Sequence, residues 1–264
     1  LIWNLGEENN TPDPDQRAIA AWIRELDPYD HPIGVHTHLN ASRRFYDGIL
    51  GDPHFEVSSI QADMAYYHEE AVQLRRRSAE AGRRWVIFHD EQSPADMGVL
   101  PDSEDPDHDI PRIEALWGNL MGGGAGVEWY FGYRFPHMDL NCEDWRSRER
   151  MWEQTRIALD FFHRELPFWE MEPVAPPFRV AEGSPMRVFA KIGEIYAIQF
   201  PRGGSAQIAL PEGEYTVHWF NPRTRGGLQQ GEVRELRGGK GRRWLGLPPA
   251  DRSRDWVALI RRKR

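Results

Sequence analysis

Three glutamates stand where short apolar runs end. Glu7 and Glu8 follow the run 1–5, and Glu91 follows the run 85–88. Cleavage of a glycosidic bond needs two facing carboxyl groups, one protonated to donate to the leaving oxygen and one ionised to act as nucleophile or to activate water. Consecutive strand residues point to opposite faces, so we expect only one of Glu7 and Glu8 to point directly into such a site. The alternative role for each carboxylate is a helix N-cap or a salt bridge.

Further polar side chains follow the neighbouring runs. Two histidines, His36 and His38, are separated by one residue, and Asp63 and Asp90 end other runs. Such a set suits zinc or another transition metal, and the alternative is a sugar-binding or structural role. Trp129 lies in an aromatic run, 126–133, and is expected either to form the floor of a sugar subsite or to pack in the core.

The elements that position these residues alternate along the first two thirds of the chain. Apolar runs predict strands at 1–5, 32–36, 57–61, 85–88 and 125–131, and the run 1–5 predicts a buried strand. Helical spacing predicts helices from Pro14 to 26, with Asp13 as N-cap, and at 69–81, 111–121 and 146–166. Alternating strands and helices indicate a parallel sheet, and such sheets place their sites at the carboxyl ends of the strands.

The pattern changes after Pro167. Residues 173–177, Pro-Val-Ala-Pro-Pro, predict a linker. Short apolar runs separated by Gly, Pro and Asn turns then predict strands at 186–191, 195–200, 206–210, 215–220, 231–236, 243–245 and 256–260. This pattern is typical of a small antiparallel β-sandwich.

The composition excludes several classes of protein. The 264 residues carry a formal net charge of −8, which argues against nucleic-acid binding and against docking on anionic lipid. No apolar run approaches the roughly 20 residues of a membrane helix. The single cysteine, Cys142, excludes an internal disulfide and a multi-cysteine zinc site. Leu1–Leu5 shows neither the basic region nor the cleavage site of a signal peptide.

Several longer runs resemble one known group of proteins. They are Trp3–Asn9, Leu26–Pro32, His89–Glu91, Ala115–Met121, Gly124–Tyr130 and Tyr215–Thr224. Together they resemble the second half of bacterial glycoside hydrolase-like (β/α)8 barrels of clan A type, followed by the β-sandwich tail labelled as collagen-binding in that group. The resemblance covers nearly the whole chain.

The resemblance implies an α/β fold: the C-terminal part of a (β/α)8 TIM barrel, its fourth to eighth strands, and then a small antiparallel β-sandwich. The implied domains are the partial barrel at 1–172, the linker at 173–177 and the sandwich at 178–264. It implies Glu8 as acid/base, with Glu7 as second choice, and Glu91 as nucleophile. Clan A barrels place Asn directly before the acid/base residue, whereas Gly6 or Glu7 stands there in this chain. The expected substrate-binding residues are Asn4, His36, His38, Asp63, Asp90, Trp129, Tyr130 and Tyr133.

We therefore expect hydrolysis of O-glycosidic bonds in a poly- or oligosaccharide by two glutamates without cofactor or metal. We expect retention of configuration, which requires carboxyl groups about 5–5.5 Å apart, whereas inversion requires about 6.5–9.5 Å. The resemblance implies an extracellular or periplasmic protein. A half barrel leaves open sheet edges, so the expected partner is the missing N-terminal half-barrel or a second copy.

Two other functions stay open. One is a non-catalytic carbohydrate- or matrix-binding protein that binds through residues 178–264. The other is a metal-dependent hydrolase that uses His36, His38, Asp63 and Asp90.

Overall fold

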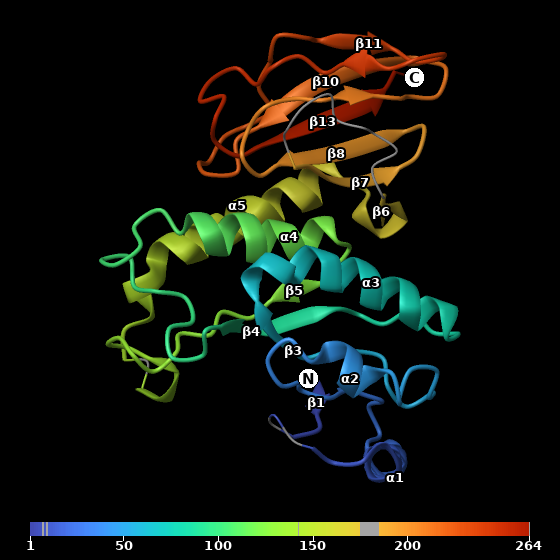
Figure 1. Ribbon diagram of the computed structural model, residues 1–264, viewed down its shortest axis with the longest axis vertical. Coiled ribbons are helices and arrows are strands. Elements are labelled where there is room, and N and C mark those ends of the chain that lie inside the picture. The colour runs from blue at the N-terminus through green and yellow to red at the C-terminus, as the bar shows by residue number, and fades with distance from the viewer. Residues whose placement is uncertain (7, 9, 142, 175–184, 264) are drawn as a thin grey trace. The chain divides into compact units, whose positions relative to one another are not determined.

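The computed structural model describes residues 1–6, 8, 10–141, 143–174 and 185–263. The chain divides into two compact units, Leu1–Arg150 and Met151–Arg264 (Figure 1). Glu7, Cys142 and residues 175–177 of the expected linker lie outside the described residues. The domain bounds taken from the sequence stay a prediction.

The N-terminal unit contains short parallel strands. They are β1 (Trp3–Asn4), β2 (Ile33–Gly34), β3 (Ile60–Asp63), β4 (Phe88–Ser93) and β5 (Gly126–Val127). The pairs β1–β2, β3–β4 and β4–β5 are all parallel, and a parallel bridge between His36 and Ser59 joins the segments that follow β2 and precede β3. The predicted parallel layer is therefore confirmed. Gly34 permits close approach here, because an added Cβ would lie 2.6 Å from the Val57 carbonyl oxygen.

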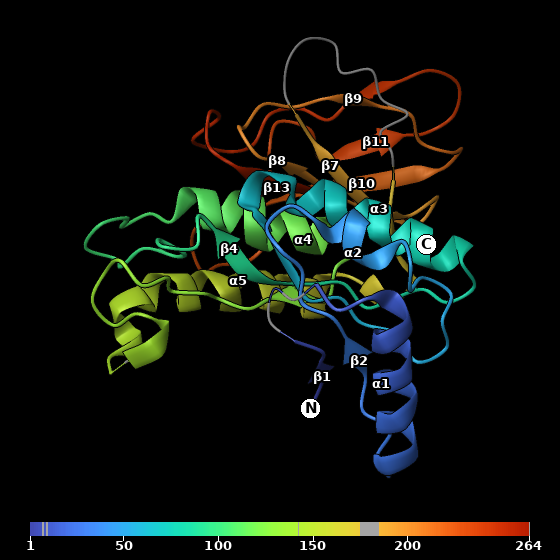
Figure 2. The same cartoon turned by 60° about the horizontal axis from the view of Figure 1, so that its bottom comes forward.

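Helices follow the strands, most of them in the predicted places, whereas the helix over residues 42–46 was not predicted. They are α1 (Asp13–Leu26), α2 (Ser42–Tyr46), α3 (Tyr67–Glu80) and α4 (Trp117–Met121), with a π-helical turn, η2 (Pro111–Leu116), before α4 and 3-10 turns η1 (Met64–Tyr66), η3 (Asp139–Asn141) and η4 (Trp145–Arg148). In Figures 1 and 2, α3 and α4 lie along one side of β3, β4 and β5. No helix in the described part of the chain is long and apolar enough to cross a membrane.

The predicted start of α1 is wrong by one residue. Pro12 occupies the N-cap position with extended backbone, and Asp13 is the first helical residue. The sequence argument placed Asp13 outside the helix, but Pro12 already ends the non-helical segment. Asp13 and Asp15 therefore lie in the first turn, where negative charge faces the positive end of the helix dipole.

The prediction that residues 1–5 form a buried strand is also wrong in part. β1 is a strand, but Leu1 is 84% exposed and Trp3 is 40% exposed. In the part of the chain that the structure describes, β1 pairs with β2 alone. An apolar run becomes buried only where another element covers it, and β1 has a neighbouring strand on one side.

The C-terminal unit is an antiparallel assembly entered through α5 (Glu149–Glu165) and the 3-10 turn η5 (Phe168–Glu170). Its strands are β6 (Glu172–Pro173), β7 (Arg187–Lys191), β8 (Ile195–Phe200), β9 (Gln207–Ile208), β10 (Glu214–Phe220), β11 (Glu235–Arg237), β12 (Arg243–Trp244) and β13 (Trp256–Arg262). Six form one sheet in the order β11-β10-β13-β8-β7-β6, and β9 pairs with β12. The predicted antiparallel strands are confirmed.

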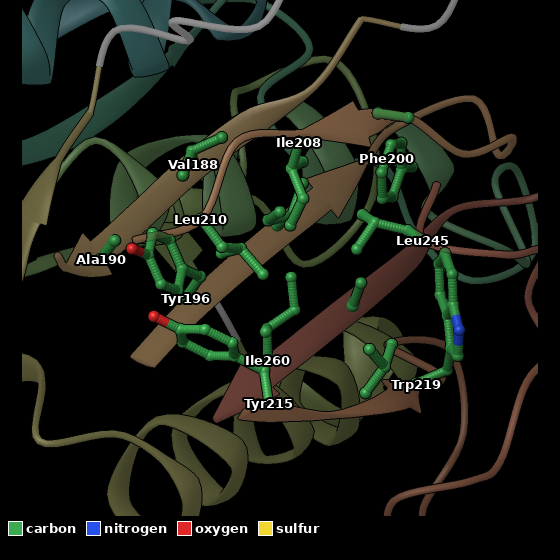
Figure 3. Close-up of a cluster of buried hydrophobic side chains, with 14 of the residues drawn as sticks. Val188, Ala190, Tyr196, Phe200, Ile208, Leu210, Tyr215, Trp219, Leu245 and Ile260 are labelled. Carbon is green, nitrogen blue, oxygen red and sulfur yellow. The ribbon is translucent and has the colours of Figure 1, made fainter. Parts of the chain in front are cut away.

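The core of this unit lies between those two sheets. Ile208 of β9 and Leu245, next to β12, join side chains of the large sheet such as Phe200 and Ile260 in one buried cluster (Figure 3). Within the same unit, Phe161 of α5 packs on Phe220 with ring centroids 4.5 Å apart. Alternate residues of each strand thus supply a continuous apolar layer.

We predict that Tyr46→Phe destabilises the N-terminal unit by about 1–3 kcal/mol. The buried Tyr46 hydroxyl accepts from the Ser59 amide and lies 2.8 and 2.9 Å from the carbonyl oxygens of Val35 and Ser59. Removing it leaves buried backbone groups without their partner, and urea denaturation measures the loss. An unchanged free energy of unfolding would contradict this account.

Candidate functional site

A shift of register between β3 and β4 shapes the centre of the N-terminal unit. Ile60 pairs with His89, but the next residue, Gln61, pairs with Glu91, so Asp90 is the extra residue of β4. Such bulges redirect side chains and occur often beside active sites. In a regular strand Asp90 and Glu91 would point to opposite faces. Here both reach the same imidazole ring.

That ring belongs to His36, which is 3% exposed. Its Nδ1 lies 3.4 Å from Asp90 Oδ1 and 3.0 Å from Ser59 Oγ, and its Nε2 lies 3.4 Å from Glu91 Oε2. Ser59 Oγ in turn donates to Asp90 and accepts from the Asn4 amide at 2.8 Å. Predicted site residues from three strand segments, Asn4, His36 and Asp90, therefore meet in one network.

Glu91 is held on several sides. It lies inside β4, whereas the sequence placed it just after the strand, because the strand runs on to Ser93. Gln61 Nε2 donates to its carboxylate at 2.5 Å, and the Tyr67 hydroxyl donates to its backbone carbonyl at 3.0 Å. Glu91 is 8% exposed. A carboxylate held in this way keeps one orientation, as a nucleophile requires.

A cavity of about 300 Å³ adjoins this network, and we call it the strand pocket. It is lined by Ile2, Asn4, Gly34, Val57, Ser58, Ser59, Phe88, Asp90, Val127 and Glu128. Residues from both β1 and β5, the first and the last parallel strand, border it. Of the network residues, Asn4, Ser59 and Asp90 line the pocket, whereas His36 and Glu91 lie next to these lining residues.

The charges of this network also affect the pKa values of two more carboxyl groups. Burial raises the pKa of Glu128, and the nearby Asp90 charge raises it further. Burial also raises the pKa of Asp139, with a smaller contribution from Glu91, while Asp139 accepts from the Phe131 amide at 2.7 Å. Carboxyl groups whose pKa values are raised by burial and by neighbouring charges are found often at functional sites.

The other predicted carboxylates lie at the carboxyl side of the strands. Glu8 Oε1 is 4.0 Å from His38 Nδ1, and both side chains are partly exposed. Asp63 exchanges two hydrogen bonds with Asn40, at 2.8 and 2.9 Å. The segment 36–38 therefore contacts Glu91 through its first residue and Glu8 through its last. Glu7 lies outside the described residues.

The aromatic candidates differ in exposure. Trp129 is 8% exposed and belongs to the core. Tyr130 is partly buried, and its amide donates to Gln92 Oε1 at 2.8 Å. Tyr133 is 60% exposed. Of the three, Tyr133 presents a free aromatic surface to solvent.

The metal alternative receives no support from the geometry. Among the described residues, no group of three or more His, Cys, Asp or Glu side chains is arranged to hold a metal ion. Asp63 pairs with Asn40, and His36 contacts Asp90 and Glu91. The four residues of that hypothesis do not assemble.

A second histidine lies on the helix side of β4. His89 is fully buried and stacks on Tyr67 with ring centroids 3.9 Å apart. Asn119 Nδ2 lies 2.8 Å from its Nδ1, and Glu70 Oε2 lies 3.4 Å from its Nε2. Burial lowers the pKa of His89 despite the Glu70 charge. The ring is therefore a neutral support behind Glu91.

We predict that acidification below pH 6.5, the usual His value, destabilises the N-terminal unit through His89. The unfolded chain binds a proton there while the folded chain does not, so stability falls as pH falls, by up to about 1.4 kcal/mol per pH unit. His89→Phe keeps the ring stacking and weakens this pH dependence in urea denaturation. The control is His163→Gln, at an exposed histidine, which is expected to keep the pH dependence of the wild type. If the free energy of unfolding depends equally on pH in both variants, the assignment to His89 is refuted.

Several residues of the network were missed from the sequence. Ser59, Gln61, Tyr67 and Glu128 were not singled out, and their contacts depend on how β3, β4, β5 and α3 are aligned. The one available signal was position: Ser59 and Gln61 lie in the predicted strand 57–61, and Glu128 lies in the predicted strand 125–131.

Comparison with solved structures shows which known proteins have a similar fold. A glycoside hydrolase family 5 protein from Bacteroides vulgatus superimposes with a TM-score of 0.69 at 13% identity, over 99% of this chain and 62% of its own. A second structure, described as a glycoside hydrolase, gives 0.71 at 12% identity, over 99% and 64%. The α-amylase from Geobacillus thermoleovorans, complexed with acarbose, gives 0.57 at 11% identity, over 100% and 60%. No family model and no curated protein matches the sequence.

The chain therefore has a glycoside hydrolase-like fold, with the predicted mixture of parallel and antiparallel β-structure. It spans less than two thirds of the length of the solved structures it matches. At 11–13% identity the likeness establishes fold alone, and the chemistry has to be argued from the site.

Proposed function

We propose that this chain carries the catalytic half of a retaining glycosidase that cleaves O-glycosidic bonds of a poly- or oligosaccharide outside the cytoplasm. Glu91 is the nucleophile and Glu8 the acid/base, with Glu7 as the second choice. The N-terminal unit corresponds to the later strands of a (β/α)8 barrel, and the C-terminal unit is an accessory β-sandwich. The glycoside hydrolase-like fold supports this class.

One observation carries the proposal: Glu91 is a buried, oriented carboxylate beside a ring that also contacts a second carboxylate. Gln61 and His36 hold its two oxygens from different strands. The neighbouring pocket is lined by polar residues such as Ser59 and Asp90 and by apolar residues such as Phe88 and Val127. A few polar groups in a partly apolar hollow are typical of sites that bind small molecules.

The reaction proceeds in two displacements. Glu91 attacks the anomeric carbon while the acid/base carboxyl gives its proton to the leaving oxygen, so the glycosidic bond breaks as the glycosyl ester forms. The acid/base residue, now ionised, takes a proton from water, and the hydroxide oxygen displaces Glu91. The sugar is released with its original configuration.

We predict that Glu91→Gln lowers kcat on aryl glycosides by at least about 10⁴-fold with normal folding, because the amide cannot form the glycosyl ester. In Glu91→Gly, sodium azide restores turnover and yields a glycosyl azide of the opposite anomeric configuration. The measurements are initial rates and product NMR.

The matched control is Glu56→Gln, the same substitution at the opposite end of the neighbouring strand segment. Glu56 pairs with Arg24 and Arg83 and contacts no part of the site. We expect wild-type kcat for this variant. Full activity of Glu91→Gln, or azide rescue at Glu56→Gly rather than at Glu91→Gly, would overturn the assignment.

We also propose that further β/α segments of the same polypeptide cover β1 and α1 in the complete protein. Trp22 and Leu26 of α1 are each 61% exposed, at i, i+4 spacing. Trp3 of β1 joins this face through its indole donor to Asp27, 2.9 Å away. In Figure 2, α1 stands apart from α3 and α4. The longer solved structures contain additional chain, and apolar helix faces of this size are normally covered.

The test compares this chain with the native gene product by hydroxyl-radical footprinting. We predict at least about threefold slower oxidation of Trp22 and Leu26 in the native protein, because covered side chains lose contact with solvent. Tyr133 serves as the exposed reference. Equal oxidation in a longer native protein, or protection only in a homodimer of this chain, would contradict the proposal.

A further inference from the structure

We propose that His36 and Glu91 share a single proton, with Ser59, Asp90 and Asn4 fixing the ring so that Nε2 faces the nucleophile. This inference rests on the proposed function for its catalytic meaning. The juxtaposition itself is independent of that function. His36 acts here as a positioning residue.

The argument begins with Ser59, which has one proton and two lone pairs. It donates that proton to Asp90, because a carboxylate only accepts. It accepts from the Asn4 amide at 2.8 Å. Since its proton is committed, its contact with His36 Nδ1 at 3.0 Å requires the ring to be the donor. The proton of a neutral His36 is therefore on Nδ1.

The consequence appears at the other ring nitrogen. Nε2 lies 3.4 Å from Glu91 Oε2. If Nε2 has no proton, its lone pair faces the carboxyl oxygen, and a favourable contact needs a proton on Glu91. If Nε2 is protonated, His36 is an imidazolium and Glu91 a carboxylate. Either way one proton lies between the two groups, and the doubly deprotonated state brings two lone pairs together.

The charges around His36 favour the imidazolium–carboxylate form. Among the described residues, β4 contributes Asp90 and Glu91, and the segment after β5 contributes Glu128, whose charge interacts with the ring. The neighbouring segments contribute the uncharged groups of Asn4, Ser59 and Gln61. A cation surrounded by carboxylates is stabilised, while burial opposes it. The same ion pair keeps Glu91 ionised, as a nucleophile requires.

The arrangement also explains the role of Asp90 in fixing the orientation of the His36 ring. A single carboxylate beside a buried histidine could hold the ring in either orientation. Asp90 acts together with Ser59 on the Nδ1 side, so the ring cannot flip without breaking these contacts. Asp90 therefore acts on Glu91 through the imidazole, although the two residues are adjacent in the chain.

The experiment is nitrogen-15 NMR of the histidine rings in the full chain between pH 4 and 9. We expect His36 to show two protonated nitrogens at neutral pH, and its titration midpoint to fall by at least about one pH unit in Glu91→Gln, since the partner charge is lost. Ser59→Ala is expected to remove the Nδ1 preference of the neutral ring. These readouts do not depend on turnover.

The matched control is Asp52→Asn, which removes a carboxylate 2.8 Å from another ring, that of His54. It is expected to change the His54 signals and leave those of His36 unaltered. An unchanged His36 midpoint in folded Glu91→Gln, or a neutral His36 with its proton on Nε2, would overturn the inference.

Kinetics separate this inference from the proposed glycosidase function. If the chain cleaves glycosides, His36→Gln is expected to lower kcat by about 10–100-fold with little change in KM, and to move the acidic limb of the pH profile to higher pH, because Glu91 then ionises without a neighbouring cation. Coupled His36 titration without any turnover would contradict the glycosidase function alone. Normal Glu91-dependent turnover without coupled titration would contradict the inference alone.

Discussion

The register shift between β3 and β4 is the constraint on which the candidate site depends. One extra residue in β4 lets consecutive carboxylates, Asp90 and Glu91, reach the two nitrogens of one ring. A regular strand would send one of them to the helix side, where His89 and Tyr67 lie. Because of the bulge, two consecutive carboxylates lie on the same side of β4.

Side chains packed against β3 and β4 hold these two carboxylates in place. The Tyr67 hydroxyl from α3 reaches the Glu91 carbonyl, and Gln92 Nε2 reaches both that hydroxyl and the Glu128 carbonyl. On the other flank the Tyr46 hydroxyl from α2 is bonded to the backbone of Ser59. Buried polar groups that are satisfied in this way fix one geometry, so helices that never touch the pocket still determine its shape.

Much of the fold could be predicted from the sequence because the local signals were strong. The strands of the C-terminal unit follow from alternating apolar residues between Gly and Pro turns, and the helices of the N-terminal unit follow from their spacing. Burial of residues 1–5 was predicted wrongly, because an apolar run does not reveal what covers it. The contact of both Asp90 and Glu91 with one ring was also beyond the sequence, since a bulge depends on the pairing of two strands.

Gly34 has a consequence for how this pocket can change. Its backbone lies so close to Val57 that any side chain there would push the two segments apart. At this one position a larger residue therefore has to displace backbone instead of filling empty space, so the pocket cannot be narrowed here by substitution alone.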